Sequence, residues 1–140
     1  MEDRGSWNVD RGEKQEERTE TPASLRRLEI WTASIALAGN VYRLSSKWPR
    51  EEVYGLTSQA RRSAVSIPAN IAEGVGRASP KEIIRFCRIA LGSAYELHTL
   101  IHLAVNLGLS LQNEVEIVLK EIDSLLKRLS RFIQYQEKKI

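Results

Sequence analysis

The sequence lacks the features that would place it in several protein classes. Its single cysteine, Cys87, lies in an apolar run, so no disulfide framework exists and a reducing compartment is expected. No stretch approaches the roughly 20 apolar residues of a membrane span, and the N-terminus has no apolar signal-peptide core. We therefore expect a cytoplasmic protein with no membrane partner. Strand-type alternation is also missing, which predicts an all-α fold.

Catalytic and metal-binding patterns are missing as well. The glycines form no phosphate-cradling motif, and Ser93 has no histidine partner motif. His98 and His102 have the i,i+4 spacing of a metal pair, but no cysteine or aspartate lies near them in sequence, which favours core or surface histidines. An enzyme using Glu73 or Glu96 would need a cleft with a strongly shifted carboxylate. We expect no enzyme, no cofactor and no metal.

The net charge of +3 over 140 residues hides an asymmetry. Residues 1–24 carry four basic and seven acidic side chains, and the remaining 116 carry seventeen and eleven. The first segment, without apolar periodicity, is predicted to be a disordered acidic tail. Residues 25–140 are predicted to form one four-helix-bundle domain, whose +6 charge is compatible with an anionic partner.

Start and stop signals divide this domain into four helices. They are expected at 25–47, from between 51 and 57 to about 73, at 80–107, and from Ser110 onward. Ser79 followed by proline and Glu82 is a capping box, Gly74 and Gly76 are stop signals, and Pro68 should kink the second helix. Short joins between long helices predict an up-down-up-down bundle.

Apolar spacing indicates which helix faces are buried. The fourth helix has a heptad seam at residues 111, 115, 118, 122, 125, 129 and 132. The third helix has one apolar face at residues 86, 90, 94, 97, 101 and 104, and another at 89, 100, 103 and 107. A helix that is apolar on two sides is buried on two sides. The bundle is therefore expected to be oligomeric.

A polar stripe runs along the second predicted helix. At 100° per residue it contains Gln59, Arg62, Ser63, Ser66, Asn70, Glu73 and Arg77. One interpretation is structural: Ser66 or Asn70 satisfies carbonyls freed by Pro68, and Glu73 pairs with Arg77. The other is a groove that binds an anion or a nucleic-acid backbone through Arg62 and Arg77. We favour the structural role for Ser66, Asn70 and Glu73, and leave both open for the arginines.

A second polar feature, the basic line, consists of Arg77, Lys81, Arg85 and Arg88, spaced by four, four and three. Basic side chains at a helix N-terminus suit phosphate, although a solvated helix face would have the same pattern. Few aromatics lie between them, which argues against base stacking and favours backbone contact.

Four runs in the central segment resemble one known family. They are Ser58-Gln59-x-Arg61-Arg62, Ser66-Ile67-Pro68-Ala69-Asn70-Ile71-Ala72-Glu73-Gly74, Ser79-x-Lys81-Glu82-x-x-Arg85-Phe86 and Ala90-x-Gly92-Ser93-x-x-Glu96-Leu97. They resemble the bacterial four-helix-bundle family whose founding members are encoded in intervening sequences of 23S ribosomal RNA genes. The resemblance spans about residues 25–110. The acidic tail departs from it, and the fourth helix matches only as a generic amphipathic helix.

The resemblance implies a non-enzymatic homopentamer with a basic surface for nucleic acid. A distant relative, the accessory variability determinant of diversity-generating retroelements, associates with a reverse transcriptase. The predicted function is therefore RNA or DNA backbone binding; the alternative is a scaffold that docks a protein partner such as a reverse transcriptase. The predicted contact residues are Gln59, Arg61, Arg62, Arg77, Lys81, Arg85 and Arg88.

Overall fold

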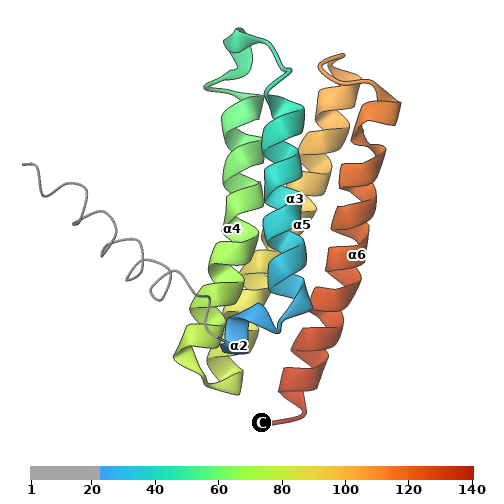
Figure 1. Ribbon diagram of the computed structural model, residues 1–140. Coiled ribbons are helices and arrows are strands. Elements are labelled where there is room, and N and C mark those ends of the chain that lie inside the picture. Colours follow the sequence, from blue (N-terminus) through green and yellow to red (C-terminus); the bar gives the residue numbers. More distant parts are fainter. Residues whose placement is uncertain (1–22) are drawn as a thin grey trace, which may run out of the picture.

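The computed structural model describes residues 23–140, and this part of the chain is helical with no strand (Figure 1). The all-α prediction is confirmed. The elements are α2 (Ala23–Arg26), α3 (Glu29–Ser45), a 3₁₀ turn η1 (Arg50–Glu52), α4 (Leu56–Arg77), α5 (Pro80–Asn106) and α6 (Gln112–Glu137). None of the helices in this range has the length and apolarity that a membrane crossing needs. The predicted acidic tail lies, except for its last two residues, outside the described residues.

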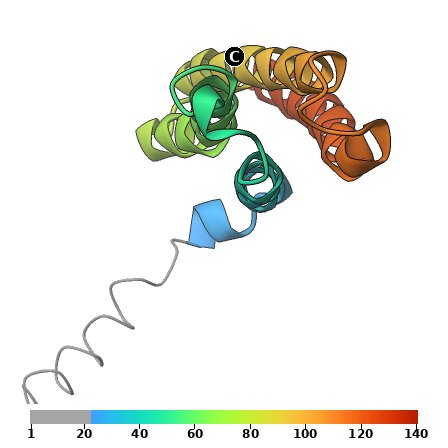
Figure 2. The same ribbon diagram turned by 90° about the horizontal axis from the view of Figure 1, so that it is seen from above.

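The four long helices lie side by side, and successive ones run in opposite directions (Figure 1). Each packs against its neighbour in sequence, and α3 also packs against α6. Seen from above, α4, α5 and α6 form an arc, and α3 lies across its open side (Figure 2). One core fills the space between the four helices, and it is composed of leucine, isoleucine, valine and alanine with Trp48 and Cys87.

The N-terminal helix differs from the prediction. It is broken at Leu28, which has extended backbone angles of φ −83° and ψ 109°, so that α2 and α3 are separate. In this conformation the Leu28 side chain packs against the core, and the Leu28 carbonyl accepts from the N–H of Trp31 at 3.0 Å. The helix ends at Ser45 rather than at residue 47. The following Trp48 is buried among the helices.

The end of α4 also differs from the prediction, because Gly74 and Gly76 do not stop the helix. It continues to Arg77 and ends where Ala78 adopts a left-handed conformation with φ 59°. Gly74 instead allows close approach of α5. A Cβ atom built on it would lie 3.0 Å from Phe86 Cβ and 3.2 Å from Ile83 Cα. The glycine thus sets the distance between two helices.

Two further local predictions concern Pro68 and Ser110. Pro68 is buried within α4, which continues without a break across it from Leu56 to Arg77. The last helix is expected to begin at Ser110, but the Ser110 hydroxyl does not cap it and instead accepts a hydrogen bond from Trp48 Nε1 at 2.7 Å. The cap is formed by Glu114, whose carboxylate accepts from the Leu111 N–H at 2.6 Å. A buried indole N–H needs a hydrogen-bond acceptor, and the Ser110 hydroxyl serves as that acceptor instead of capping α6.

The predicted apolar faces are buried to different degrees. The α6 seam is buried at residues 115, 118, 122, 125 and 129, whereas Leu111 is exposed. On α5 the face at residues 90, 94, 97, 101 and 104 is buried. Of the second α5 face Leu100 is buried, and Ile89, Leu103 and Leu107 are exposed. This single chain leaves these three apolar side chains uncovered, Ile89 in the first half of α5 and Leu103 and Leu107 at and just after its C-terminal end.

Candidate functional site

Ser66 and Asn70 of α4 form a hydrogen-bond network with α5. The hydroxyls of Ser66 and Ser93 are 2.8 Å apart, and Asn70 Nδ2 donates to the Ser66 carbonyl at 2.8 Å and to its hydroxyl at 3.0 Å. The carbonyl that loses its partner at Pro68 belongs to Ala64, so Asn70 does not satisfy it as predicted. The network ties the two helices together at mid-height.

Beside this network the surface is hollowed into the serine groove. It has a volume of about 380 Å³ and is lined by Gln59, Arg62, Ser63, Ser66, Ser93 and Glu96. Gln59 and Arg62 are exposed, and the side chain of neither forms a hydrogen bond or ion pair with another described residue. These two predicted contact residues are therefore free to bind a ligand, although Glu96 places a negative charge on the same groove.

Arg61, a third predicted contact residue, is held against α3. Its Nε donates to Ser45 Oγ at 2.8 Å, and one terminal nitrogen donates to the Tyr42 carbonyl at 3.3 Å. The guanidinium also lies over the Tyr42 ring, 4.6 Å from its centroid. Arg61 thus joins α4 to α3 and has a fixed position, while part of its five-donor set remains unused.

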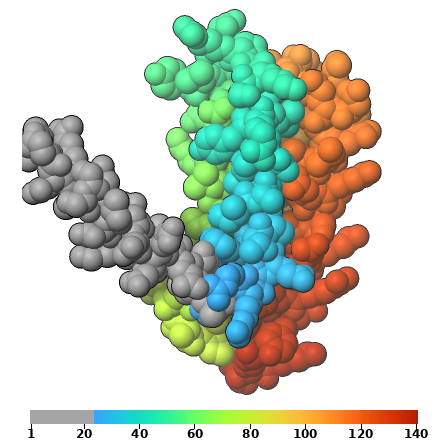
Figure 3. All heavy atoms as spheres, in the orientation of Figure 1, coloured from blue at the N-terminus to red at the C-terminus, as the bar shows by residue number. Residues whose placement is uncertain are grey.

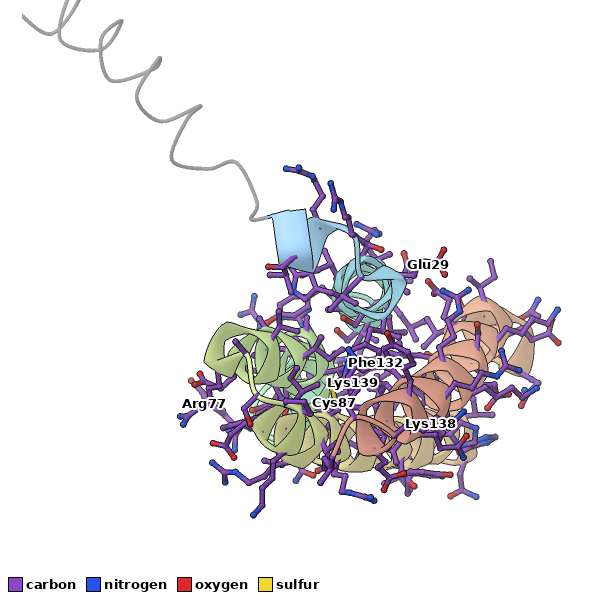
Figure 4. All side chains as sticks on the ribbon, turned by 90° about the horizontal axis from the view of Figure 1, so that it is seen from below. Glu29, Arg77, Cys87, Phe132, Lys138 and Lys139 are labelled. Carbon is purple, nitrogen blue, oxygen red and sulfur yellow. The ribbon has the colours of Figure 1, made fainter. Side chains whose placement is uncertain are left out.

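The basic line is accompanied by carboxylates. Arg77 pairs with Glu73 at 3.1 Å and with Glu82 at 3.3 Å, and Arg85 pairs with the same Glu82 at 3.0 Å. Glu82 therefore bridges two arginines, and its own backbone N–H donates to the Ser79 hydroxyl at 3.3 Å. Arg77 lies at the outside of the bundle (Figure 4).

Arg88 of the basic line pairs with Glu137 of α6 at 2.9 Å, which leaves Lys81 without an ionic partner among the described residues. The predicted core position Phe86 is only half-buried, and the guanidinium groups of Arg77 and Arg85 lie 4.9 and 4.5 Å from its centroid. Three carboxylates thus offset all but one charge of the four cations. Exposed pairs of this kind are weak, but they reduce the local positive potential.

A stronger concentration of unpaired positive charge lies on α6, away from the contact residues predicted from the sequence. We name it the α6 surface, and it consists of Lys120, Lys127, Arg128 and Arg131. They line a shallow hollow of about 280 Å³ together with Asp123 and Ser124, and none of them forms an ion pair with a described residue. Side chains of α6 stand out along one edge of the molecule (Figure 3). In the sequence, this surface is visible only as basic residues toward the C-terminal end of the fourth predicted helix. Their favourable interaction with the helix dipole alone would explain that position.

The environments of the single thiol and the two histidines do not form a reactive or metal-binding site among the described residues. Cys87 points into the bundle (Figure 4), and burial raises its thiol pKa to about 11, so the reactive thiolate is suppressed at neutral pH. The rings of His98 and His102 are 4.6 Å apart, and His98 Nε2 lies 3.5 Å from Asp123. Between residues 23 and 140, no three potential ligands gather to hold a metal.

The helices, their shared core and the polar contacts between α4 and α5 define an all-α helical bundle with charged outer surfaces. The chain belongs to the 23S rRNA-intervening sequence protein family, whose sequence signature matches residues 26–131. Its fold is similar to the crystal structure of a protein of unknown function from the S23 ribosomal protein family of Bacteroides thetaiotaomicron VPI-5482. The TM-score is 0.67 at 22% identity, over 74% of this chain and 97% of that one. No curated protein matches the sequence.

Proposed function

We propose that this protein is a non-enzymatic, cytoplasmic, homo-oligomeric up-down-up-down bundle that binds the backbone of RNA or DNA, and that the α6 surface makes the principal contacts. The observation that carries the proposal is the absence of ionic partners for Lys120, Lys127, Arg128 and Arg131 among the described residues. The family name, which refers to ribosomal RNA, supports an RNA ligand.

The dimensions of the α6 surface suit a nucleic-acid backbone. Lys120 and Arg131 are eleven residues apart on one helix, which corresponds to about 16 Å along its axis. A duplex presents one phosphate charge per roughly 1.7 Å of its axis, so several phosphates face a helix of this length. Lysine and arginine contacts to phosphate carry no sequence information, and we therefore expect binding that depends on backbone shape and charge.

Charge compensation favours the α6 surface over the basic line. A phosphate that approaches Arg77, Arg85 or Arg88 competes with carboxylates at 2.9 to 3.3 Å. At the α6 surface Asp123 lies among the four cations, and Glu29 lines an adjoining hollow with Arg128 and Arg131, but neither carboxylate forms an ion pair with any of the four. Separating exposed ion pairs costs little, about 0–1 kcal/mol each, so the basic line can add to binding without directing it.

The exposed apolar residues of α5 support self-association. Ile89, Leu103 and Leu107 are 41 to 56% exposed, and a second copy would remove them from water. The resemblance described above implies a pentamer. Light scattering of the purified protein with and without nuclease treatment should give five subunits in both cases, with excess mass before treatment. A nuclease-treated monomer would contradict the assembly.

Two matched variants test the binding surface, because each removes four cations. One replaces Lys120, Lys127, Arg128 and Arg131 with glutamine, and the other does the same to Arg77, Lys81, Arg85 and Arg88. We expect the first to weaken binding to a fluorescent RNA hairpin at least about tenfold at low salt, and the second to weaken it less. Equal affinity of the α6 variant and the unmodified protein would refute the assignment. A larger loss of RNA affinity in the basic-line variant would show that the basic line, as predicted from the sequence, is the principal binding surface.

The alternative function, a scaffold for a protein partner such as a reverse transcriptase, is supported by a different observation. Ile35 and Val65 are nearly half exposed on α3 and α4, where a polyanion would gain nothing from contact with them. Co-purification of a protein at high salt after nuclease treatment would favour this role. Loss of every partner at high salt would favour the nucleic-acid role.

A further inference from the structure

A second pocket lies on the other side of the molecule's polar helix, between the end of α3 and the beginning of α4. We name it the α4 pocket. It has a volume of about 430 Å³ and is lined by Tyr42, Val53, Thr57, Ser58, Arg61, Arg62 and Val65. Its residues come from the first three turns of α4, from the Tyr42 turn of α3, and from the loop that joins the two helices.

The first turn of α4, whose residues Thr57 and Ser58 line this pocket, leaves two backbone donors without an acceptor among the described residues. The cap residue Gly55 has no side chain to accept them. The Leu56 N–H donates to the Glu52 carboxylate at 3.2 Å, and the Gln59 N–H donates to the Gly55 carbonyl at 3.1 Å. No described atom accepts from the N–H groups of Thr57 and Ser58. Because α4 is 22 residues long, these donors also carry the positive end of a full helix dipole.

Thr57 provides an independent indication of a ligand. The residue is only 6% exposed, and its hydroxyl oxygen is buried with no hydrogen-bond partner among the described residues. An unpaired buried hydroxyl is unfavourable, and native proteins generally provide a partner for such a group. Threonine in a helix uses two χ1 rotamers, so its hydroxyl can turn toward a group bound in the pocket.

Two arginines supply positive charge one turn further along. Arg61 is fixed by its hydrogen bonds to Ser45 and to the Tyr42 carbonyl, so its position requires no reorganisation. Arg62 has no such bond and is exposed, and it can move toward this pocket or toward the serine groove. Two carboxylates compete with a bound anion: Glu52 accepts from the Leu56 N–H in the first turn of α4, and Glu96 lines the serine groove.

We propose that the α4 pocket binds a phosphomonoester. The donors are the N–H and hydroxyl groups of Thr57 and Ser58 together with the guanidinium groups of Arg61 and Arg62. A phosphomonoester offers three acceptor oxygens and nearly two negative charges, which matches this donor set better than the two oxygens of a carboxylate. The apolar wall formed by Val53, Val65 and the Tyr42 ring leaves room for the organic part of the ligand. The site is separate from the α6 surface and does not depend on it.

Titration of the labelled full-length protein tests the site directly. Inorganic phosphate and adenosine monophosphate should each shift the amide resonances of Thr57 and Ser58 saturably, whereas acetate and adenosine should not. A 5′-phosphorylated RNA oligonucleotide that binds more tightly than its 5′-hydroxyl counterpart would identify a nucleic-acid end as the source of the phosphate. Equal binding of the two oligonucleotides, with retained binding of the monophosphate, would identify a small molecule. The proposal would be overturned if neither inorganic phosphate nor adenosine monophosphate gave a saturable shift. It would also be overturned if acetate bound as tightly as phosphate.

Two variants distinguish a binding role from a structural one. Thr57→Val removes the unpaired hydroxyl without changing the side-chain shape, so the free protein should melt at the same or a higher temperature. The same variant should lose phosphate affinity by roughly threefold or more, and Arg62→Gln by about tenfold, as expected for neutral and charged hydrogen bonds.

The matched controls are Thr99→Val, whose hydroxyl is bonded to the Tyr95 carbonyl, and Lys127→Gln on the α6 surface. Both should bind phosphate as the unmodified protein does. Unchanged phosphate affinity in Thr57→Val or in Arg62→Gln would overturn the assignment. Because the α6 surface is not involved, weaker RNA binding with phosphate binding retained, in the variant that replaces all four cations of the α6 surface, separates this site from the proposed function.

Discussion

Gly74 is the position where one added methyl group should test the packing of the bundle. In Gly74→Ala the new Cβ would meet Phe86 Cβ at 3.0 Å and Ile83 Cα at 3.2 Å. Both atoms belong to or lie next to the α5 backbone, so they can move only if the helix moves. Overpacking of this kind costs about 1–3 kcal/mol. Alanine gains about 1 kcal/mol over glycine in a helix, which offsets part of that cost.

Gly76 offers a matched control two residues further along the same helix. No atom lies within 4 Å of the Cβ that alanine would add there. Gly76→Ala should therefore show the helix-propensity gain alone, reduced by its position near the end of α4. The gain common to both variants largely cancels in the comparison. We expect Gly74→Ala to be less stable than Gly76→Ala by about 1–3 kcal/mol.

Urea denaturation followed by circular dichroism measures this difference. The unfolding midpoint of Gly76→Ala should lie at or above that of the unmodified protein, and the midpoint of Gly74→Ala should lie below that of Gly76→Ala. Equal stabilisation by both substitutions would show that α5 yields freely at Gly74. The close approach of α4 and α5 would then not be a constraint on the fold.

Three further predictions concern buried polar groups. Ser110→Ala leaves the buried Trp48 Nε1 without its acceptor and should lower the free energy of unfolding by about 1–3 kcal/mol, measured by urea denaturation. Burial raises the Cys87 pKa from 9.0 to about 11, so the folded state favours the neutral thiol; this contribution is complete below pH 9 and is lost as the pH rises toward 11. The loss of stability across that interval should be smaller in Cys87→Ala, and an identical pH profile would contradict it. Ser66→Ala should destabilise the bundle by about 1 kcal/mol because Asn70 and Ser93 both lose a partner, whereas an unchanged melting temperature would show that water replaces the hydroxyl.

Periodicity predicted the helical class and most of the buried faces, because side chains that meet one core must recur with the helical repeat. The positions where helices are interrupted or end were harder to predict from the sequence. Leu28 interrupts the first helix without a glycine or proline signal, and Gly74 and Gly76 carry a stop signal that the helix ignores. In both cases tertiary packing overrides local propensity: Leu28 packs against the core, and Gly74 admits α5.

The polar residues show where sequence spacing reaches its limit. Spacing placed Glu73 and Arg77 as a possible pair, and the two side chains are 3.1 Å apart. It did not reveal that Glu137, 49 residues after Arg88, lies beside that arginine, because such a contact depends on how α5 and α6 pack. For the same reason spacing could not distinguish paired cations from the unpaired ones of α6. It also could not show the unpartnered hydroxyl of Thr57.

The salt dependence of duplex binding tests the role of the α6 surface most directly. The logarithm of the binding constant for a short DNA or RNA duplex should fall linearly with the logarithm of salt concentration, by about 0.9 for each phosphate contact on DNA. Replacing the four cations of the α6 surface with glutamine should reduce that slope by about 3 to 4. An unchanged slope in this variant would show that the nucleic-acid backbone does not contact α6.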